Sequence, residues 1–309
     1  MARTRKPRGR DTRWQAALRA GATHGARLVI ERRRMKSRMR SVAPARVRSL
    51  RAAARPLIVA EGDSWFDYPF FNVLDALEHG FGYEVESVAH AGDTVEGMAY
   101  DPGQLSGFNR MLDKLQQQGR PPAAVMLSAG GNDIAGPTLA ALLNDGASPA
   151  PGLNESVMVG VVDQRLRDAL VTVLSTVTNL CRAHFGAALP ILIHGYDYAV
   201  ADGRGYAGGF WLLPGPWLEP HFRTRGYPSV EGRKPHMKAL IDRFNAMAAR
   251  VAGGPGLAHV DYVDLRGTLS GETAGGKYKR SWANELHPTR PGFSDVAARF
   301  DRALRAAGV

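Results

Sequence analysis

The chain has almost no cysteine and no long apolar run. Cys181 is the single cysteine among 309 residues, so no disulfide can form within the chain. It falls in an apolar pattern, which predicts a buried small hydrophobic side chain and not a reactive thiol. No stretch of about 18 apolar residues occurs, so no membrane-spanning helix is expected. The first 26 residues are polar and Arg-rich, without the apolar core of a signal peptide. The default expectation is a cytoplasmic location, with a dedicated secretion route as the alternative.

Acidic residues are scarce at the start of the chain. Residues 1–55 carry Asp11 and Glu31 against 18 Lys and Arg, a net charge of +16, whereas the remainder carries 22 basic and 27 acidic residues. The overall charge of +11 therefore belongs to a basic N-terminal arm, residues 1–55. The remaining residues, 56–309, are predicted to form one mildly acidic domain.

One helical face of the arm carries Leu28, Met35, Met39 and Val42, with arginines between them. This pattern is typical of a basic amphipathic helix that lies on an anionic membrane or docks on an acidic partner. The alternatives are a partly disordered arm and a helix packed on the body. Because interleaved aromatic residues and nucleic-acid-binding motifs are lacking, no specific nucleic-acid recognition is expected.

From residue 56 onward, strand-like and helix-like segments alternate. Strands are predicted at Leu57–Glu61, Tyr83–Ala89, Ala123–Ser128, Ala188–His194 and Ala258–Leu265. Helices are predicted near Phe71–Glu78, Phe108–Gln117, Val162–His184, His236–Ala252 and Ser294–Ala307. Such alternation is typical of parallel strands joined by right-handed crossovers, so the predicted fold class is α/β, a three-layer α/β/α sandwich with a mostly parallel sheet.

Four chemically suggestive positions each follow a predicted strand. They are Ser64 in a Gly-Asp-Ser turn, Gly92 in Ala-Gly-Asp, Asn132 in Gly-Gly-Asn-Asp, and His287 near the end of the chain. The carboxyl ends of parallel strands meet at one edge of a sheet, where open α/β folds place their chemistry. We therefore expect these four residues to lie together. His90 and His194 also lie near strand ends and are expected to line the same site.

These residue types suit attack on an ester by a serine. The Ser64 hydroxyl is a poor nucleophile until a histidine removes its proton. Attack on the carbonyl creates an oxyanion, and the backbone N–H groups of Ser64 and Gly92 and the side-chain amide of Asn132 can donate to it. Asp63 and Asp133 are expected to hold their loops through hydrogen bonds to the backbone.

In these motifs the chain resembles the SGNH hydrolase family, also called GDSL esterases and lipases. The resemblance covers about residues 56–307 and rests on Gly62-Asp63-Ser64, Gly92, Gly131-Asn132-Asp133 and His287-Pro288 in the family's order. It implies a flavodoxin-like sheet and serine-dependent hydrolysis of esters or thioesters without a metal or other cofactor. It also implies Ser64 as nucleophile, His287 as base, and Ser64, Gly92 and Asn132 as the oxyanion hole.

The sequence departs from the family at two positions. Where the family usually carries an aspartate three residues before the histidine, this chain has Asn284. Asn284 can orient His287 by accepting from its N–H, but it cannot stabilise an imidazolium by charge. The alternative is a nearby carboxylate, with Glu285, Asp261 and Asp264 as candidates. The second departure is Trp65, which replaces the usual leucine after the serine and is expected to shape the substrate pocket.

Residues 196–235 follow the fourth predicted strand and are rich in Gly, Pro and aromatic residues. Loops of this length are usually functional or disordered, and the aromatic content argues against disorder. We therefore expect a wall or lid that binds an apolar part of the substrate, with Phe210, Trp211 and Trp217 as candidate contacts. The alternative is a loop that packs on the body for stability alone.

The predicted function is an ester hydrolase of the esterase or lipase type, with acyl-chain or lipid substrates favoured by the aromatic segment. Within the same chemistry, a carbohydrate O-acetyl esterase or a thioesterase is the alternative. A different class is a non-catalytic binding or effector protein that docks through the basic arm, in which Asn284 would mark lost activity. Composition rich in Ala, Arg and Gly indicates a GC-rich bacterial genome.

Two kinds of cofactor site are not expected. No group of His, Cys and Asp residues has the spacing of a zinc or calcium site. Residues 203–208 match a dinucleotide-binding fingerprint, but they do not lead from a strand directly into a helix, so the match is taken as accidental.

Overall fold

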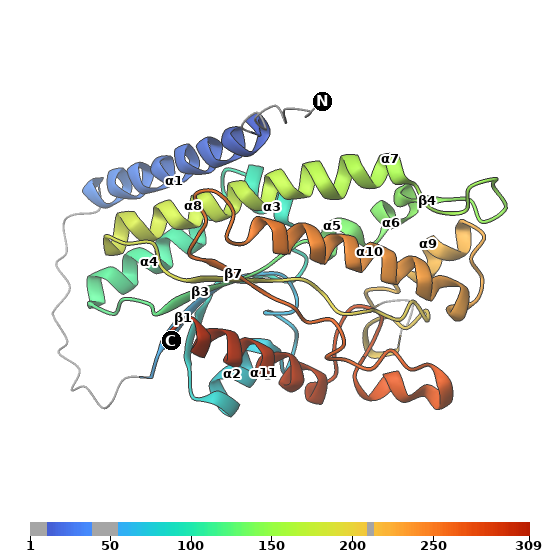
Figure 1. Ribbon diagram of the computed structural model, residues 1–309. Helices are drawn as coiled ribbons and strands as arrows, with labels where there is room; N and C mark the ends of the chain where they lie inside the picture. The colour runs from blue at the N-terminus through green and yellow to red at the C-terminus, as the bar shows by residue number, and fades with distance from the viewer. Residues whose placement is uncertain (1–10, 39–54, 209–212) are drawn as a thin grey trace, which may run out of the picture.

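The computed structural model describes residues 11–38, 55–208 and 213–309 of the chain (Figure 1). A parallel sheet forms its centre, with β1 (Leu57–Gly62), β2 (Glu84–Ser87), β3 (Ala124–Ser128), β6 (Ile191–His194) and β7 (Val260–Val263). Each strand coincides with one of the five predicted segments, which confirms that part of the prediction.

The strands are arranged in the order β2-β1-β3-β6-β7, and every neighbouring pair is parallel. Counted along these five strands, the order is 2-1-3-4-5, which is the flavodoxin-like doubly wound arrangement. The strand order reverses between β1 and β3. Their carboxyl ends therefore form the switch point at which sheets of this kind bind ligands, and Ser64 and Asn132 directly follow these two strands.

Helices cover both faces of the sheet (Figure 1). One face packs against α2 (Val73–Phe81) and α11 (Arg290–Ala306), and the other against α4 (Ser106–Gln118), α8 (Arg167–Phe185) and α10 (Val230–Val251). Because both faces are covered, every residue of β1, β3 and β6 is buried. The predicted three-layer α/β/α sandwich is confirmed.

Several short elements lack a periodic sequence pattern and were not predicted. They are α3 (Val95–Tyr100), α5 (Gly131–Ile134), α6 (Pro137–Leu142), α7 (Glu155–Met158), α9 (Glu219–Thr224), β4 (Leu143–Asn144), β5 (Gly152–Leu153) and two 3-10 segments (Tyr206–Gly208 and Ala274–Arg280). The helix predicted over Val162–His184 is confirmed as α8 together with a π-helical segment (Val159–Leu166) that leads directly into it. The helix predicted from His236 begins earlier, at Val230, where the Ser229 side chain caps it by accepting from the Gly232 N–H; Pro235 lies inside the helix and removes one backbone hydrogen bond.

The N-terminal arm contains α1 (Thr12–Arg38), which lies along α8 as an additional outer layer (Figure 1). For residues 12–38, the structure thus agrees with the alternative prediction that the arm forms a helix packed on the body. Its buried face differs from the predicted apolar face. Trp14 and Leu28 are buried, whereas Met35 is 56% exposed. Met39 and Val42 lie outside the described residues.

Small residues explain why α1 approaches α8 so closely. A Cβ atom on Gly21 would lie 2.3 Å from the carbonyl oxygen of Thr172, and one on Gly25 would also crowd the α8 backbone. The hydroxyl of Ser175 on α8 donates to the Leu18 carbonyl oxygen of α1 at 2.7 Å. The contact therefore requires glycine at positions 21 and 25, in addition to the buried apolar side chains of α1.

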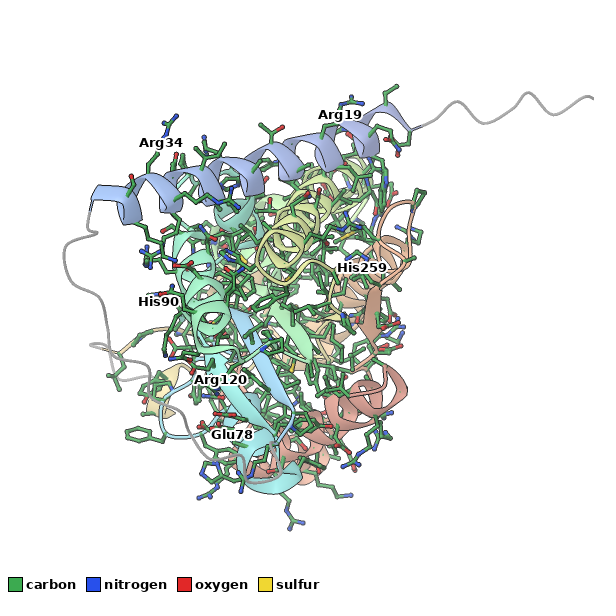
Figure 2. The ribbon with its side chains drawn as sticks, turned by 90° about the vertical axis from the view of Figure 1, so that its left-hand side faces the viewer. Arg19, Arg34, Glu78, His90, Arg120 and His259 are labelled. Carbon is green, nitrogen blue, oxygen red and sulfur yellow. The ribbon has the colours of Figure 1, made fainter. Side chains whose placement is uncertain are left out.

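Arginines occupy the outward side of α1. Arg19 and Arg34 point away from the body (Figure 2), and Arg27 and Arg33 are also exposed. Arg32 instead turns inward and pairs with Asp113 of α4 at 2.9 Å. Among the described residues, no helix is long and apolar enough to cross a membrane.

Candidate active site

Ser64 and His287 meet at the carboxyl edge of the sheet. The Oγ atom of Ser64 lies 2.7 Å from Nε2 of His287, and Nδ1 of His287 lies 2.9 Å from Oδ1 of Asn284. An amide oxygen can only accept, so Nδ1 carries the proton and Nε2 is free to accept from the serine hydroxyl. This arrangement can activate a serine through a histidine whose tautomer is set by a third side chain.

The orientation of the Asn284 amide is determined by its neighbours. Its Oδ1 atom accepts from the backbone N–H groups of Leu286 and His287, both at 2.9 Å, and its Nδ2 donates to the Tyr68 hydroxyl at 3.1 Å. A flipped amide would place its NH₂ group against three donors. Asn284 therefore presents an acceptor to the imidazole, as a carboxylate in this position would, but without the negative charge.

None of the three carboxylates proposed as substitutes takes this place. Asp261 is exposed on β7, and Asp264 pairs with Arg266 at 2.6 Å. Glu285 is fully buried, and its carboxylate accepts hydrogen bonds from backbone N–H groups within residues 203–219. The partner of His287 Nδ1 is Asn284.

His287 lies in an aromatic environment. Its ring stacks on Tyr68 with centroids 4.3 Å apart, and Trp217 meets it edge-on at 5.5 Å. Only 5% of the histidine is exposed, and this burial lowers the pKa of His287 to about 3. The imidazole is consequently a neutral base throughout the ordinary pH range.

The loops that carry Gly92 and Asn132 are tied to each other. The Asn132 side chain donates to the Asp93 carbonyl at 2.9 Å, which orients its amide. The Asp133 carboxylate accepts from the backbone N–H groups of Val95 at 2.9 Å and Glu96 at 3.2 Å, which confirms its predicted loop-holding role. Gly92 has φ = 97°, a left-handed conformation that favours glycine, and no atom lies within 4 Å of the place where a Cβ would be.

A buried network holds the turn that carries Ser64. The Asp63 carboxylate accepts from the Trp65 backbone at 3.0 Å, from the Ser128 hydroxyl at 2.7 Å and from the Tyr196 hydroxyl. The predicted loop-holding role of Asp63 is thus confirmed. His194, expected to line the site, instead lies behind the turn, with Nε2 2.8 Å from the Ser128 hydroxyl.

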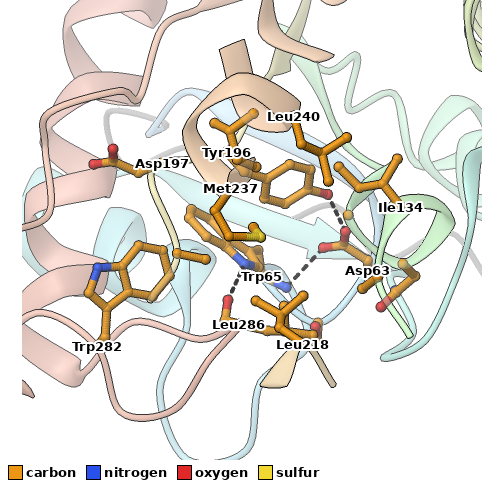
Figure 3. Close-up of a pocket in the computed structure, with 16 residues that line it drawn as sticks. Asp63, Trp65, Ile134, Tyr196, Asp197, Leu218, Met237, Leu240, Trp282 and Leu286 are labelled. Atoms are coloured by element: carbon orange, nitrogen blue, oxygen red, sulfur yellow. Dashed lines mark hydrogen bonds between the residues drawn. The ribbon is translucent and has the colours of Figure 1, made fainter. Parts of the chain in front are cut away.

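An apolar pocket lies beside Ser64 (Figure 3). Trp65 lines it as expected, and its indole N–H donates to the Leu286 carbonyl at 3.0 Å. Trp217 packs against His287 and is not part of the pocket wall. Phe210 and Trp211, the other two candidate substrate contacts, lie outside the described residues.

Glu285 attaches the segment 196–235 to the loop that carries His287. One carboxylate oxygen accepts from the backbone N–H groups of Gly203 and Glu219, both at 2.9 Å. The other accepts from Trp217 at 2.8 Å and Leu218 at 2.7 Å. The sequence places Glu285 between two site residues, but nothing in its pattern indicates these four partners, which come from a distant part of the chain.

We expect Glu285→Gln to destabilise the protein by about 2–6 kcal/mol, because the amide nitrogen would leave two backbone N–H groups without an acceptor, at roughly 1–3 kcal/mol each. Urea unfolding measures the change. Glu272→Gln is the matched control, since Glu272 forms an exposed pair with Lys277 worth about 0–1 kcal/mol. Equal stability of the two variants would contradict the assignment.

Within residues 11–38, 55–208 and 213–309, no three His, Cys, Asp or Glu side chains are grouped as a metal site. The candidate site brings together Ser64, His287 and Asn284, and the loops that carry Gly92 and Asn132 are linked beside it.

No protein-family model matches the chain, and no curated protein matches its sequence. Among solved structures, it is similar to an aryl esterase from M. smegmatis, with 14% identity, 82% of this chain and 99% of that chain covered, and a TM-score of 0.46. A carbohydrate acetylesterase from Sinorhizobium meliloti has 13% identity, coverage of 82% and 99%, and a TM-score of 0.45. A GDSL-like lipase from Bacteroides thetaiotaomicron has 13% identity, coverage of 81% and 88%, and a TM-score of 0.37. At these identities and TM-scores, the fold class of the chain rests on its own sheet topology.

Proposed function

We propose that this protein is a serine hydrolase of carboxylic esters, of the SGNH type. The observation that carries the proposal is the hydrogen-bonded series from the Ser64 hydroxyl through the His287 imidazole to the Asn284 amide oxygen. Ser64 lies near the start of the domain's sequence and His287 and Asn284 near its end, yet they meet in space. The serine hydroxyl donates to Nε2 and Nδ1 donates to the amide oxygen, which is the order that proton removal from serine needs. The oxyanion donors lie on loops joined to the same edge.

The reaction follows from these positions. Ser64 Oγ attacks the ester carbonyl carbon while His287 Nε2 takes its proton, and the negative charge on the carbonyl oxygen is stabilised by Asn132 and by backbone N–H groups. His287 then returns the proton to the alkoxy oxygen, the C–O bond breaks, and the alcohol leaves. Water repeats the sequence on the acyl-serine, which releases the acid and restores Ser64.

Asn284 gives this mechanism a distinct charge balance. The imidazolium that forms beside Asn284 has no carboxylate to compensate it, so the oxyanion is the nearest opposite charge. The dipole of the Asn284 oxygen and the stacked Tyr68 ring assist. Such a site suits an ester better than an amide, because the C–O bond of an ester can break with little proton donation, whereas the nitrogen of an amide must be protonated before its C–N bond breaks.

A fluorophosphonate tests the proposal, because it reacts with serines that a neighbouring base has activated. We expect one adduct per chain, on the peptide that contains Ser64, together with hydrolysis of p-nitrophenyl acetate. His287→Ala should abolish both. Absence of the adduct and of turnover would overturn the proposal and favour the non-catalytic binding protein.

We also propose that the outward arginines of α1 bind anionic membrane surfaces. Trp14, Leu28 and Val29 of α1 are buried on the body, so the attachment proposed here is through charge. Each basic residue near an anionic surface contributes about 1 kcal/mol. Deleting the arm would expose the core beneath Trp14 and Leu28, so charge reversal is the cleaner experiment.

Four reversals to Glu on α1, at Arg19, Arg27, Arg33 and Arg34, should weaken binding to phosphatidylserine vesicles by roughly 10³-fold, at about 1 kcal/mol per residue. Sedimentation with vesicles measures the loss, and neutral phosphatidylcholine vesicles give the background. Arg110→Glu with Arg302→Glu is the control, because both residues are exposed elsewhere on the body. Unchanged binding of the α1 variant would show that these arginines do not attach the protein to membranes.

A further inference from the structure

The pocket beside Ser64 is lined by apolar side chains from four parts of the chain: the turn after β1, α5, the segment 196–235 and α10. Met237 and Leu240 from α10 extend toward Trp65 and Tyr196 (Figure 3). Leu218 and Ile134 complete the wall. These six residues are each at most 6% exposed. Asp63 also borders the space, but its carboxylate is engaged by three donors of the protein. The pocket therefore suits an uncharged, apolar group.

Its size limits what can enter. The cavity has a volume of about 40 Å³. One water-sized sphere needs roughly 10–15 Å³ in this measure, so about three or four non-hydrogen atoms fit. A butyryl group has three carbons beyond its carbonyl carbon, and an acetyl group has one. An octanoyl group has seven and would require the wall to move.

The position of the pocket relative to the base shows which half of the ester it receives. Ser64 and Asn132 line the pocket, whereas His287 does not. The departing alcohol takes its proton from His287 and therefore lies on the imidazole side. The acyl chain points away from it, past Asn132, into the apolar space.

We propose that this protein cleaves esters of short acyl groups of about two to four carbons, and that the α10 wall at Met237 sets the upper limit. This inference rests on the proposed ester hydrolysis and specifies its substrate class. The aromatic segment 196–235 led us to expect acyl-chain or lipid substrates. This inference restricts them to short acyl chains, because the pocket wall leaves little room beyond a butyryl chain.

The test compares kcat/KM for p-nitrophenyl acetate, butyrate, hexanoate and octanoate. In the wild type, we expect acetate and butyrate to exceed octanoate by about 10-fold or more, because one misfitting methylene already changes kcat/KM by roughly 10-fold or more. Met237→Ala should raise the hexanoate-to-acetate ratio by about 10-fold. Met237→Leu keeps the volume of the wall and should keep the wild-type profile.

Ala199→Leu provides the opposite change, because Ala199 lines the pocket and a larger side chain would fill it. We expect it to reduce butyrate turnover selectively while acetate turnover persists. Thermal melting shows whether Met237→Ala folds. If it does not, Ala199→Leu still tests whether the pocket wall sets the acyl-chain limit. Ser64-dependent turnover that peaks at octanoate, or chain-length profiles unchanged in both variants, would overturn the short-chain assignment alone. Missing phosphonate labelling with missing turnover would instead overturn the hydrolase itself.

Discussion

Ser64→Ala should lower kcat for hydrolysis of p-nitrophenyl acetate by about 10⁴–10⁶-fold, because a nucleophile that acts with its base as a unit carries most of the chemistry. Without the hydroxyl, no acyl-enzyme forms, and only the oxyanion donors remain to accelerate direct attack by water: the backbone N–H groups of residues 64 and 92 and the Asn132 amide. Steady-state kinetics measures the loss, with phosphonate titration to count active sites. His287→Ala should cost a similar factor, and the double variant little more.

Ser156→Ala is the matched control for this prediction, because Ser156 is an exposed serine on α7 away from the site. It should leave kcat and KM unchanged. Thermal melting should show that Ser64→Ala remains folded, since the Ser64 hydroxyl makes its hydrogen bond to His287 and the turn is held by Asp63 instead. A Ser64→Ala variant that retains a tenth of the wild-type rate would assign the turnover to another group.

The parts of this molecule that were predictable from sequence are those encoded by short-range patterns. The run of residues 57–60 is apolar, as expected for a strand that helices cover on both faces, so this strand is visible in the sequence alone. The positions of Ser64 and Asn132 follow from the same logic, because each residue directly follows a strand. Parallel pairing then brings the two strand ends to one edge.

The parts that could not be predicted depend on contacts between distant segments. Tyr68 belongs to no motif, yet it stacks on His287 and bonds to Asn284, which lies 216 positions away. The sequence offers Glu285 as a partner of the imidazole, but in the fold its carboxylate accepts from four backbone N–H groups of a distant segment instead. The docking of α1 depends on Gly21 and Gly25, residues that a search for apolar periodicity ignores.

The second large effect on activity is expected from the charge of residue 284, which contacts Nδ1 of His287. In the wild type, the low pKa of His287, about 3, keeps the imidazole neutral as the pH falls. The active form is the neutral one, so kcat/KM should remain level through pH 6.5 and decline only as the pH approaches that low value. An ordinary histidine base would already be half protonated near pH 6.5.

Asn284→Asp should move this acidic decline upward by about 1–3 pH units, because a carboxylate against Nδ1 favours the imidazolium and raises the pKa of His287. The same charge stabilises the imidazolium in the transition state, so kcat at pH 8 should rise. Asn284→Leu removes the acceptor and with it the fixed tautomer, and should lower kcat by about 10²–10⁴-fold. The pH dependence of kcat/KM for p-nitrophenyl acetate, measured in all three proteins, gives both effects.

Asn154→Asp is the control for the added charge, because Asn154 caps α7 through its side-chain oxygen and an aspartate can do the same. It should leave the pH profile unchanged. A wild-type profile that declines near pH 6.5 and does not shift in Asn284→Asp would mean that His287 is not the base. A shift confined to Asn284→Asp would establish that an uncharged amide orients the imidazole here, and that the missing carboxylate limits the rate without abolishing the chemistry.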